Sequence, residues 1–195
     1  MPVNDIRLIK KDLREKSKIL RRALSADEKA ARDAQIAALV TALPAFAQAD
    51  VLLTYIALPI EVDTAAVIRA ARGAGKAVAA PRCVPGTSDM VFYFFDTEAD
   101  LAPGTFGVPE PVANSAHELR DFSTGLCLVP ALSYDRQGYR LGYGKGYYDR
   151  FLSNYSGVTV GLCYHDCVGE LLPHGKYDRP VDLLVTEKWV KRMWE

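Results

Sequence analysis

The chain has 195 residues, of which 49% are hydrophobic and 25% are charged, and its 24 basic residues balance its 24 acidic residues. These values are ordinary for a globular protein, so we expect residues 1–195 to form a single domain. Balanced charge excludes proteins whose whole surface is basic for nucleic-acid binding. No apolar run reaches the length of a membrane span, and the N-terminus lacks a signal-peptide core. We therefore expect a cytoplasmic protein that binds neither membranes nor nucleic acid.

The cysteines do not form a recognisable bridge or metal pattern. None of the four follows CxxC spacing: Cys83, Cys127, Cys163 and Cys167. In a reducing compartment such residues are buried thiols more often than disulfides. The CxHxC segment around His165 resembles half of a zinc site, but it lacks a fourth ligand at finger-like spacing. We therefore expect no metal there.

Two helices are predicted at the beginning of the chain. Four apolar residues near the N-terminus recur at helical spacing between many lysines and arginines: Ile6, Ile9, Leu13 and Leu20. This pattern predicts an amphipathic basic helix, and its cations are expected on a solvated face. A second helix should begin after Ser25, because Ser25 and Glu28 form a capping box. It should end at Pro44.

The remaining chain alternates short apolar runs with helix signals. Runs typical of buried strands cover residues 51–57, 76–81, 90–95, 126–132, 158–164 and 182–186. Asp63 or Thr64 can cap a helix that extends to about Gly73. Alternating strands and helices predict an α/β fold. We expect one three-layer domain, with a mostly parallel central sheet and helices on both faces.

The segment from Asp135 to Gly146 carries the strongest signal for a ligand site. Glycines alternate there with cations: Arg136, Gly138, Arg140, Gly142, Gly144, Lys145 and Gly146. Such glycines permit positive φ and let successive N–H groups line an anion-binding concavity. A helix starting at Tyr147 would add its N-terminal dipole. The glycines, the cations and the helix start together favour a phosphate site over a flexible loop. The spacing fits neither a Walker A loop nor GxGxxG, so these residues do not identify the compound that binds.

The wider sequence VPALSYDRQGYRLGYGKGYYDRFL, residues 129–152, resembles the signature of the 5-formyltetrahydrofolate cyclo-ligase family, also called methenyltetrahydrofolate synthetase. Other segments are similar to the family's remaining blocks, in the same order: Lys10 to Arg14, Glu61 to Thr64, Gly104 to Pro111 and Asp178 to Glu187. That family uses ATP and Mg²⁺ to convert 5-formyltetrahydrofolate to 5,10-methenyltetrahydrofolate, with release of ADP and phosphate. The resemblance implies an ATP-dependent ligase of folate one-carbon metabolism that acts on these small molecules as a monomer.

The resemblance also implies the residues of the site. Contacts to ATP are expected from Lys10, Lys11, Arg14, Arg140, Gly142, Tyr143, Gly144, Lys145, Gly146, Tyr147 and Tyr148. Of these, Arg140 and Lys145 are expected to be catalytic. Phosphoryl transfer requires positioning and neutralisation of oxygen charge, so no residue is expected to act as a nucleophile.

The folate and the metal are assigned to other side chains. Family positions that contact the folate correspond to Ile56, Glu61 and Tyr147, and Phe106 and Glu110 are expected near the substrate cleft. Mg²⁺ prefers one or two carboxylates together with phosphate oxygens. The resemblance places Asp149 and Asp182 in this role.

Two other function classes compete with this interpretation. An enzyme of another class on a similar scaffold, such as a sugar-phosphate isomerase, would turn over a sugar phosphate without nucleotide. A non-catalytic relative would bind nucleotide, folate or RNA as a module. The basic N-terminal helix is the feature that favours RNA, and RNA binding with a steep salt dependence would identify that class.

Overall fold

A computed structural model describes residues 6–193, without the side chains of Phe106 and Ser115. At its centre is a seven-stranded sheet with the order β12-β11-β9-β6-β1-β2-β3. These strands are β1 (Val51–Leu53), β2 (Ala77–Cys83), β3 (Met90–Phe94), β6 (Gly125–Pro130), β9 (Val158–Leu162), β11 (Leu183–Val185) and β12 (Val190–Arg192). The five inner strands are parallel, and the two edge strands are antiparallel to their neighbours. The predicted mostly parallel α/β sheet is confirmed.

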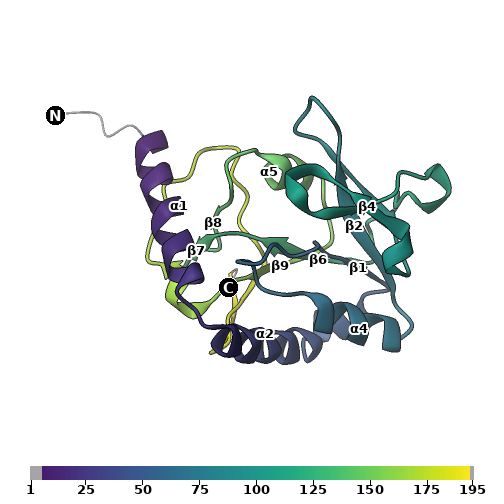
Figure 1. Cartoon of the computed structure of the whole chain (residues 1–195), viewed down its shortest axis with the longest axis horizontal. Helices are drawn as coiled ribbons and strands as arrows, with labels where there is room; N and C mark the ends of the chain where they lie inside the picture. The colour runs from purple at the N-terminus through teal and green to yellow at the C-terminus, as the bar shows by residue number, and fades with distance from the viewer. Residues whose placement is uncertain (1–5, 194–195) are drawn as a thin grey trace.

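Helices cover the sheet on both sides. They are α1 (Ile6–Arg22), α2 (Ala26–Thr41), α3 (Pro44–Gln48), α4 (Ala65–Gly73) and α5 (Tyr147–Leu152). Helices α2 and α4 lie next to each other along the lower side of the sheet in Figure 1, whereas α5 lies on the opposite side. The capping box at Ser25 is present, with a 3.2 Å bond from the Glu28 N–H to the Ser25 hydroxyl. Pro44, predicted only as a helix end, also begins α3, where its missing N–H has no cost.

Shorter elements surround the carboxyl edge of the sheet. A three-stranded sheet contains β7 (Ser133–Asp135), β8 (Arg140–Leu141) and β10 (Val168–Gly169), and β4 (Leu101–Pro103) pairs with β5 (Pro109–Pro111). Single 3₁₀ turns are η1 (Glu98–Asp100), η2 (Thr105–Gly107), η3 (Ser115–His117) and η4 (His165–Cys167). The buried Asp135 carboxylate stabilises the β7–β8 turn by accepting from the N–H groups of Gln137 and Tyr139. The β7–β8 turn thereby holds in place the chain that leads into the glycines at positions 142, 144 and 146.

The core is formed by the inner strands and the helices below them. Leu126 and Leu128 of β6 are fully buried, as expected for a central strand with both faces covered. Leu52 of β1, Ile36 of α2 and Val67 of α4 belong to the same buried cluster. Because the inner strands are parallel, the loops after β1, β2 and β6 all emerge at one edge of the sheet. Within residues 6–193, no helix has the length and apolar character needed to cross a membrane.

Helix α1 presents its polar face to the protein. Its two buried residues are Ser17 and Arg21, which continue the stripe begun by Lys10 and Arg14. The apolar Leu20, from the predicted amphipathic pattern, is 47% exposed. The helix was predicted correctly, but the expectation that its remaining cations lie on the surface is wrong for Arg21. The polar stripe faces inward because it meets backbone carbonyls of the loops at the sheet edge.

Candidate active site

A cavity of about 690 Å³ lies at the carboxyl edge of the sheet. Its walls come from α1, the loops after β1 and β8, strand β2, the segment around η2, and the start of α5. Most of the predicted site residues line it together: Lys10, Arg14, Ile56, Glu61, Arg140, Gly142, Tyr143, Gly144, Lys145, Gly146, Tyr147, Tyr148 and Asp149. This volume falls in the range of small-molecule sites.

The glycine-rich loop, residues 142–146, connects β8 to α5. Gly144 and Gly146 have φ of +90° and +79°, whereas Gly142 does not have positive φ. The Nε of Arg14 donates a 2.8 Å hydrogen bond to the Gly142 carbonyl. A Cβ on Gly144 would lie 3.0 Å from Nη2 of Arg14. Two of the three glycines of this loop therefore take the left-handed conformation expected of them, and α1 packs directly against the loop.

Four cationic side chains line the cavity around the glycine-rich loop, and we call this the cationic end: Lys10, Arg14, Arg140 and Lys145. The side chain of Arg140 is 5% exposed, and its guanidinium forms an ion pair with Asp149 and donates to the Arg179 carbonyl at 2.6 Å. Lys10 forms an ion pair with Asp178 at 3.0 Å. Lys145 is exposed, and within the described part of the chain it has no hydrogen-bond or ion-pair partner. Together with Arg14, these side chains make a positively charged wall beside the loop amides.

Asp149 is the carboxylate best placed for a divalent cation. It lines the cavity from the first turn of α5, and burial raises its pKa against the lowering effect of Arg140. The Asp178 carboxylate is close enough to act on Asp149 electrostatically. An oxygen donor set of one or two carboxylates beside a phosphate site suits Mg²⁺. The residues present therefore fit the metal that the sequence predicts.

Asp182 is not brought to this site. Its carboxylate accepts from the backbone N–H of Thr159 at 2.8 Å and from the Thr159 hydroxyl at 2.6 Å. Both residues lie at the amino ends of their strands, β11 and β9, and neither lines the cavity. The prediction that Asp182 binds Mg²⁺ does not fit, because in parallel strands the amino ends lie opposite the carboxyl edge. Lys11 also points elsewhere, to an exposed face of α1.

Glu61 forms a buried acidic point in the cavity wall. It is 5% exposed, and its carboxylate accepts from the Leu58 N–H at 2.8 Å and from the Tyr143 hydroxyl. Burial raises the pKa of Glu61, and these two hydrogen bonds act in the opposite direction. No lysine or arginine of residues 6–193 forms an ion pair with it. A buried carboxylate of this kind can accept hydrogen bonds from N–H groups of a ligand.

The remaining lining of the cavity is mostly apolar, and we call it the apolar end. Ile56, Pro81, Met90, Val108 and Leu141 contribute to its lining. Glu110 is 7% exposed and accepts from the Thr105 N–H at 3.1 Å, beside Cys83. Glu110 thus lines the cavity, whereas the side chain of Phe106 lies outside the described residues. Such walls suit a flat ring with a few polar edges.

Tyr148 lines the cavity with atoms other than its hydroxyl. Its hydroxyl oxygen is inaccessible to solvent, and it has no hydrogen-bond partner within residues 6–193. A buried hydroxyl without a partner costs free energy, and such groups are rare in native proteins.

Two residues of this region were missed in the sequence. Asp178 was assigned only to a family block, yet it lines the cavity and holds Lys10. Arg21 is 3% exposed and donates to the carbonyls of Leu132, Ala131 and Ile60 at 3.0, 2.7 and 2.9 Å. Its guanidinium thereby ties α1 to the loop before Glu61. The spacing Lys10, Arg14, Arg21 follows one helical face and could have indicated this role.

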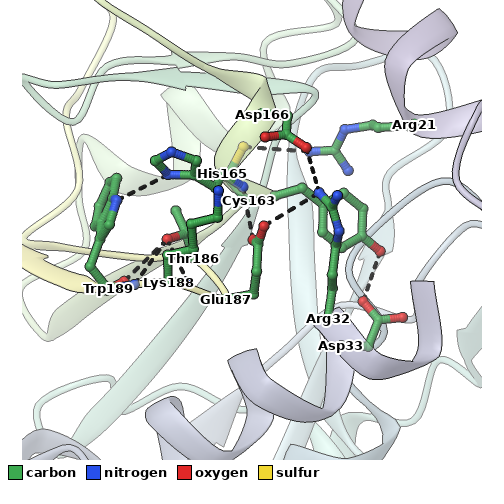
Figure 2. Close-up of polar contacts among 11 residues, drawn as sticks. Arg21, Arg32, Asp33, Cys163, His165, Asp166, Thr186, Glu187, Lys188 and Trp189 are labelled. Carbon is green, nitrogen blue, oxygen red and sulfur yellow. Dashed lines mark hydrogen bonds and ion pairs between the residues drawn. The ribbon is translucent and has the colours of Figure 1, made fainter. Parts of the chain in front are cut away.

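The CxHxC segment forms contacts within the protein (Figure 2). Nδ1 of His165 accepts from the Trp189 indole N–H at 3.0 Å, and the Cys163 sulfur lies 3.7 Å from Arg21. Arg32 of α2 pairs with Asp166 of the same segment. Among residues 6–193, no group of three or more metal-ligating side chains was found.

Comparison with known proteins agrees with this architecture. A family model described as the 5-formyltetrahydrofolate cyclo-ligase family matches residues 7–187. The 5-formyltetrahydrofolate cyclo-ligase of Escherichia coli K12 is 28% identical over 180 residues, covering 90% of this chain and 97% of that protein. The mouse 5-formyltetrahydrofolate cyclo-ligase is 28% identical over 190 residues, covering 91% and 93%. The structure of Aquifex aeolicus 5,10-methenyltetrahydrofolate synthetase has a TM-score of 0.83 and 33% identity, covering 96% of this chain and 94% of that one.

Proposed function

The chain belongs to the 5-formyltetrahydrofolate cyclo-ligase family, and we propose that it uses ATP and Mg²⁺ to cyclise 5-formyltetrahydrofolate to 5,10-methenyltetrahydrofolate. One observation carries the proposal: a single cavity joins a cationic glycine-rich loop to an apolar end that contains the buried carboxylate of Glu61. A phosphate donor and a polar heterocycle can therefore meet in one cavity.

The cationic end is proposed to hold the triphosphate. Loop amides at Gly144 and Gly146 can approach phosphate oxygens closely, because glycine has no side chain there. Lys10, Arg14 and Arg140 add positive charge from two directions. Lys145, which has no hydrogen-bond or ion-pair partner among residues 6–193, is free to follow the phosphoryl group that is transferred. Stabilising charge on that group's oxygens is the main requirement of phosphoryl transfer.

Mg²⁺ would be held by Asp149, which lines the cavity from the first turn of α5. When bound, the ion supplies neutralisation of phosphate charge and orientation of the oxygens. The ion pair between Asp149 and Arg140 keeps the carboxylate at the cavity wall. Arg140 is in turn fixed by the Arg179 carbonyl, so both side chains are ordered before any ligand binds.

The apolar end is proposed to hold the folate. Ile56 and Met90 offer contact to a ring, and Glu61 can accept hydrogen bonds from its N–H edge. A formamide carbon is a poor electrophile because nitrogen lone-pair donation stabilises the group. Attack of the formyl oxygen on the γ-phosphorus forms the new P–O bond and releases ADP. Attack of N10 on the carbon of the resulting iminium phosphate closes the ring, and N10 then loses its proton. Departure of inorganic phosphate, with cleavage of the C–O bond, leaves the methenyl bridge.

The experiment that tests this function combines the protein, Mg-ATP and 5-formyltetrahydrofolate and follows the near-ultraviolet absorbance of the methenyl product. Product should form only when the protein, ATP, the divalent cation and 5-formyltetrahydrofolate are all present. The amount of ADP released should equal the amount of methenyl product formed. Absence of product, with binding of either ligand intact, would instead indicate a non-catalytic binding module. Turnover of a sugar phosphate without nucleotide would indicate the other enzyme class.

A further inference from the structure

Asp178, which has no assigned contact to a ligand, forms an ion pair with Lys10, one of the cavity cations. Oδ2 of Asp178 lies 3.0 Å from the Lys10 ammonium and also accepts from the Gly175 N–H at 2.7 Å. Each of the two charged side chains is 21% exposed. Burial acts to raise the pKa of Asp178, but these hydrogen bonds, together with the positive charges of Lys10 and Arg140, outweigh it and hold the pKa below its ordinary value. Asp178 is therefore a charged, well-held acceptor at the cavity wall.

The neighbouring backbone holds a second cation. The Arg179 carbonyl accepts from Nη1 of Arg140 at 2.6 Å. Residues 175–179 thus contact both Lys10 from α1 and Arg140 from β8, although these two lie far apart in sequence. Both contacts are made to side chains that the proposed function places on the triphosphate.

An ion pair of this kind restricts the motion of a flexible lysine side chain. Its ammonium has three donors on a flexible four-carbon stem, and fixing that stem costs side-chain entropy. One donor to Asp178 leaves two for a phosphate. The negative charge of Asp178 also opposes phosphate binding, so positioning and charge repulsion act with opposite signs. A variant that removes the charge can therefore tell which effect is larger.

We propose that Asp178 is a positioning residue for the nucleotide: it holds the Lys10 ammonium at the phosphate end of the cavity before Mg-ATP arrives. This inference rests on the proposed function. It requires that Asp178 strengthens Mg-ATP binding through Lys10 and through no other residue.

The test is a double-mutant cycle on Mg-ATP affinity, measured by titration calorimetry with the full chain. Lys10→Met and Asp178→Asn should each weaken binding about tenfold, and the double variant should bind no more weakly than Lys10→Met. Asn keeps an acceptor for the Gly175 N–H. The KM for 5-formyltetrahydrofolate should not change. Glu15→Gln is the matched control, because Glu15 pairs with Lys18 on the same helix and does not line the cavity.

Several results would overturn the inference. Unchanged or tighter Mg-ATP binding in Asp178→Asn would show that the residue is only a counter-ion. Additive losses in the double variant would show that it does not act through Lys10. An equal rise in the folate KM would make it a structural residue. If the wild-type protein binds Mg-ATP and only Lys10→Met is weakened, this inference alone fails; if the wild-type protein does not bind Mg-ATP, the proposed function fails with it.

Discussion

The side chain of Arg14 donates from Nε to the Gly142 carbonyl at 2.8 Å, which joins the N-terminal helix to a loop 128 residues later in the chain. The same guanidinium lies over Gly144, where a Cβ would be 3.0 Å from Nη2. The shape of the proposed triphosphate site therefore depends on α1 as well as on the loop.

Gly144→Ala should distort this loop. A non-glycine residue at φ +90° is strained by about 1–2 kcal/mol, and the new methyl group would also press on Arg14. We expect Mg-ATP affinity to fall about tenfold with a small loss of melting temperature. Gly142→Ala is the control, because its φ is not positive and a Cβ there meets no atom within 4 Å. Equal effects of the two variants in calorimetry would remove the special role of Gly144.

Tyr148→Phe should leave the protein at least as stable as the wild type. Its buried hydroxyl has no partner within residues 6–193, so removal relieves a penalty of about 1–3 kcal/mol and should not lower the melting temperature. Turnover should stay close to that of the wild type, because the hydroxyl oxygen is inaccessible from the cavity. In contrast, Tyr134→Phe removes a 2.9 Å bond to the Val129 carbonyl and should destabilise the protein. A Tyr148→Phe variant that melts clearly below the wild type in thermal denaturation would show that this hydroxyl has a partner in the folded protein.

Glu61→Gln should weaken folate binding and change the pH dependence of stability. Loss of a charged acceptor should raise the folate KM about 10- to 100-fold, with ATP affinity nearly unchanged. An ATP-specific defect would contradict the proposed division of the cavity.

The stability effect of Glu61 follows from its raised pKa. Because the folded protein binds this proton more tightly, its contribution to stability is complete below the unfolded pKa of 4.5 and is lost as pH rises through the folded pKa. The glutamine variant should therefore melt above the wild type at pH 7 and equally at pH 4. Melting curves that keep the same separation at both pH values would show that Glu61 does not titrate in this way.

Arg21→Lys should be strongly destabilising. A lysine cannot reproduce three hydrogen bonds in a planar fork, so buried carbonyls would lose their partners at a cost of about 2–4 kcal/mol. The neighbouring Arg22 is exposed, and Arg22→Lys should change the free energy of unfolding by less than about 0.5 kcal/mol. Denaturant titrations of both variants check this, and similar midpoints would contradict the structural role of Arg21.

Lys145→Ala should affect turnover without affecting the fold. The side chain is exposed and has no partner in the described chain, so the melting temperature should stay within experimental error. Loss of one cation at a transition state typically lowers kcat/KM by about 10² to 10³. Lys145→Arg should recover only part of this, because a planar guanidinium replaces a compact charge. Wild-type kinetics for the alanine variant would remove Lys145 from the mechanism.

The sequence predicted those parts of the protein in which local chemistry determines structure. The capping box at Ser25 and the positive φ of Gly144 and Gly146 are local properties, and the structure confirms them. Short strands such as β7 and β8 have too few residues for a periodic pattern and depend on tertiary contacts. The positions of the site residues likewise depend on tertiary contacts, which a local sequence pattern does not show.

Arg21 and Asp182 show where a sequence pattern misleads. A helix rich in cations resembles a solvated face, yet Arg21 is buried because three loop carbonyls converge on it. Asp182 stands in a family block, yet it directly precedes β11 at the edge of the sheet opposite the cavity, and its carboxylate accepts hydrogen bonds from Thr159. The direction of a side chain and the end of the sheet it occupies are properties of the assembled fold.

The most direct test of the central claim follows an oxygen atom. 5-Formyltetrahydrofolate labelled with ¹⁸O in the formyl group is converted with Mg-ATP, and the released phosphate is analysed by mass spectrometry. If the formyl oxygen attacks the γ-phosphate, each inorganic phosphate should carry one ¹⁸O atom. Unlabelled phosphate, with the ¹⁸O recovered in water, would show that ATP does not activate the formyl oxygen and would contradict the mechanism.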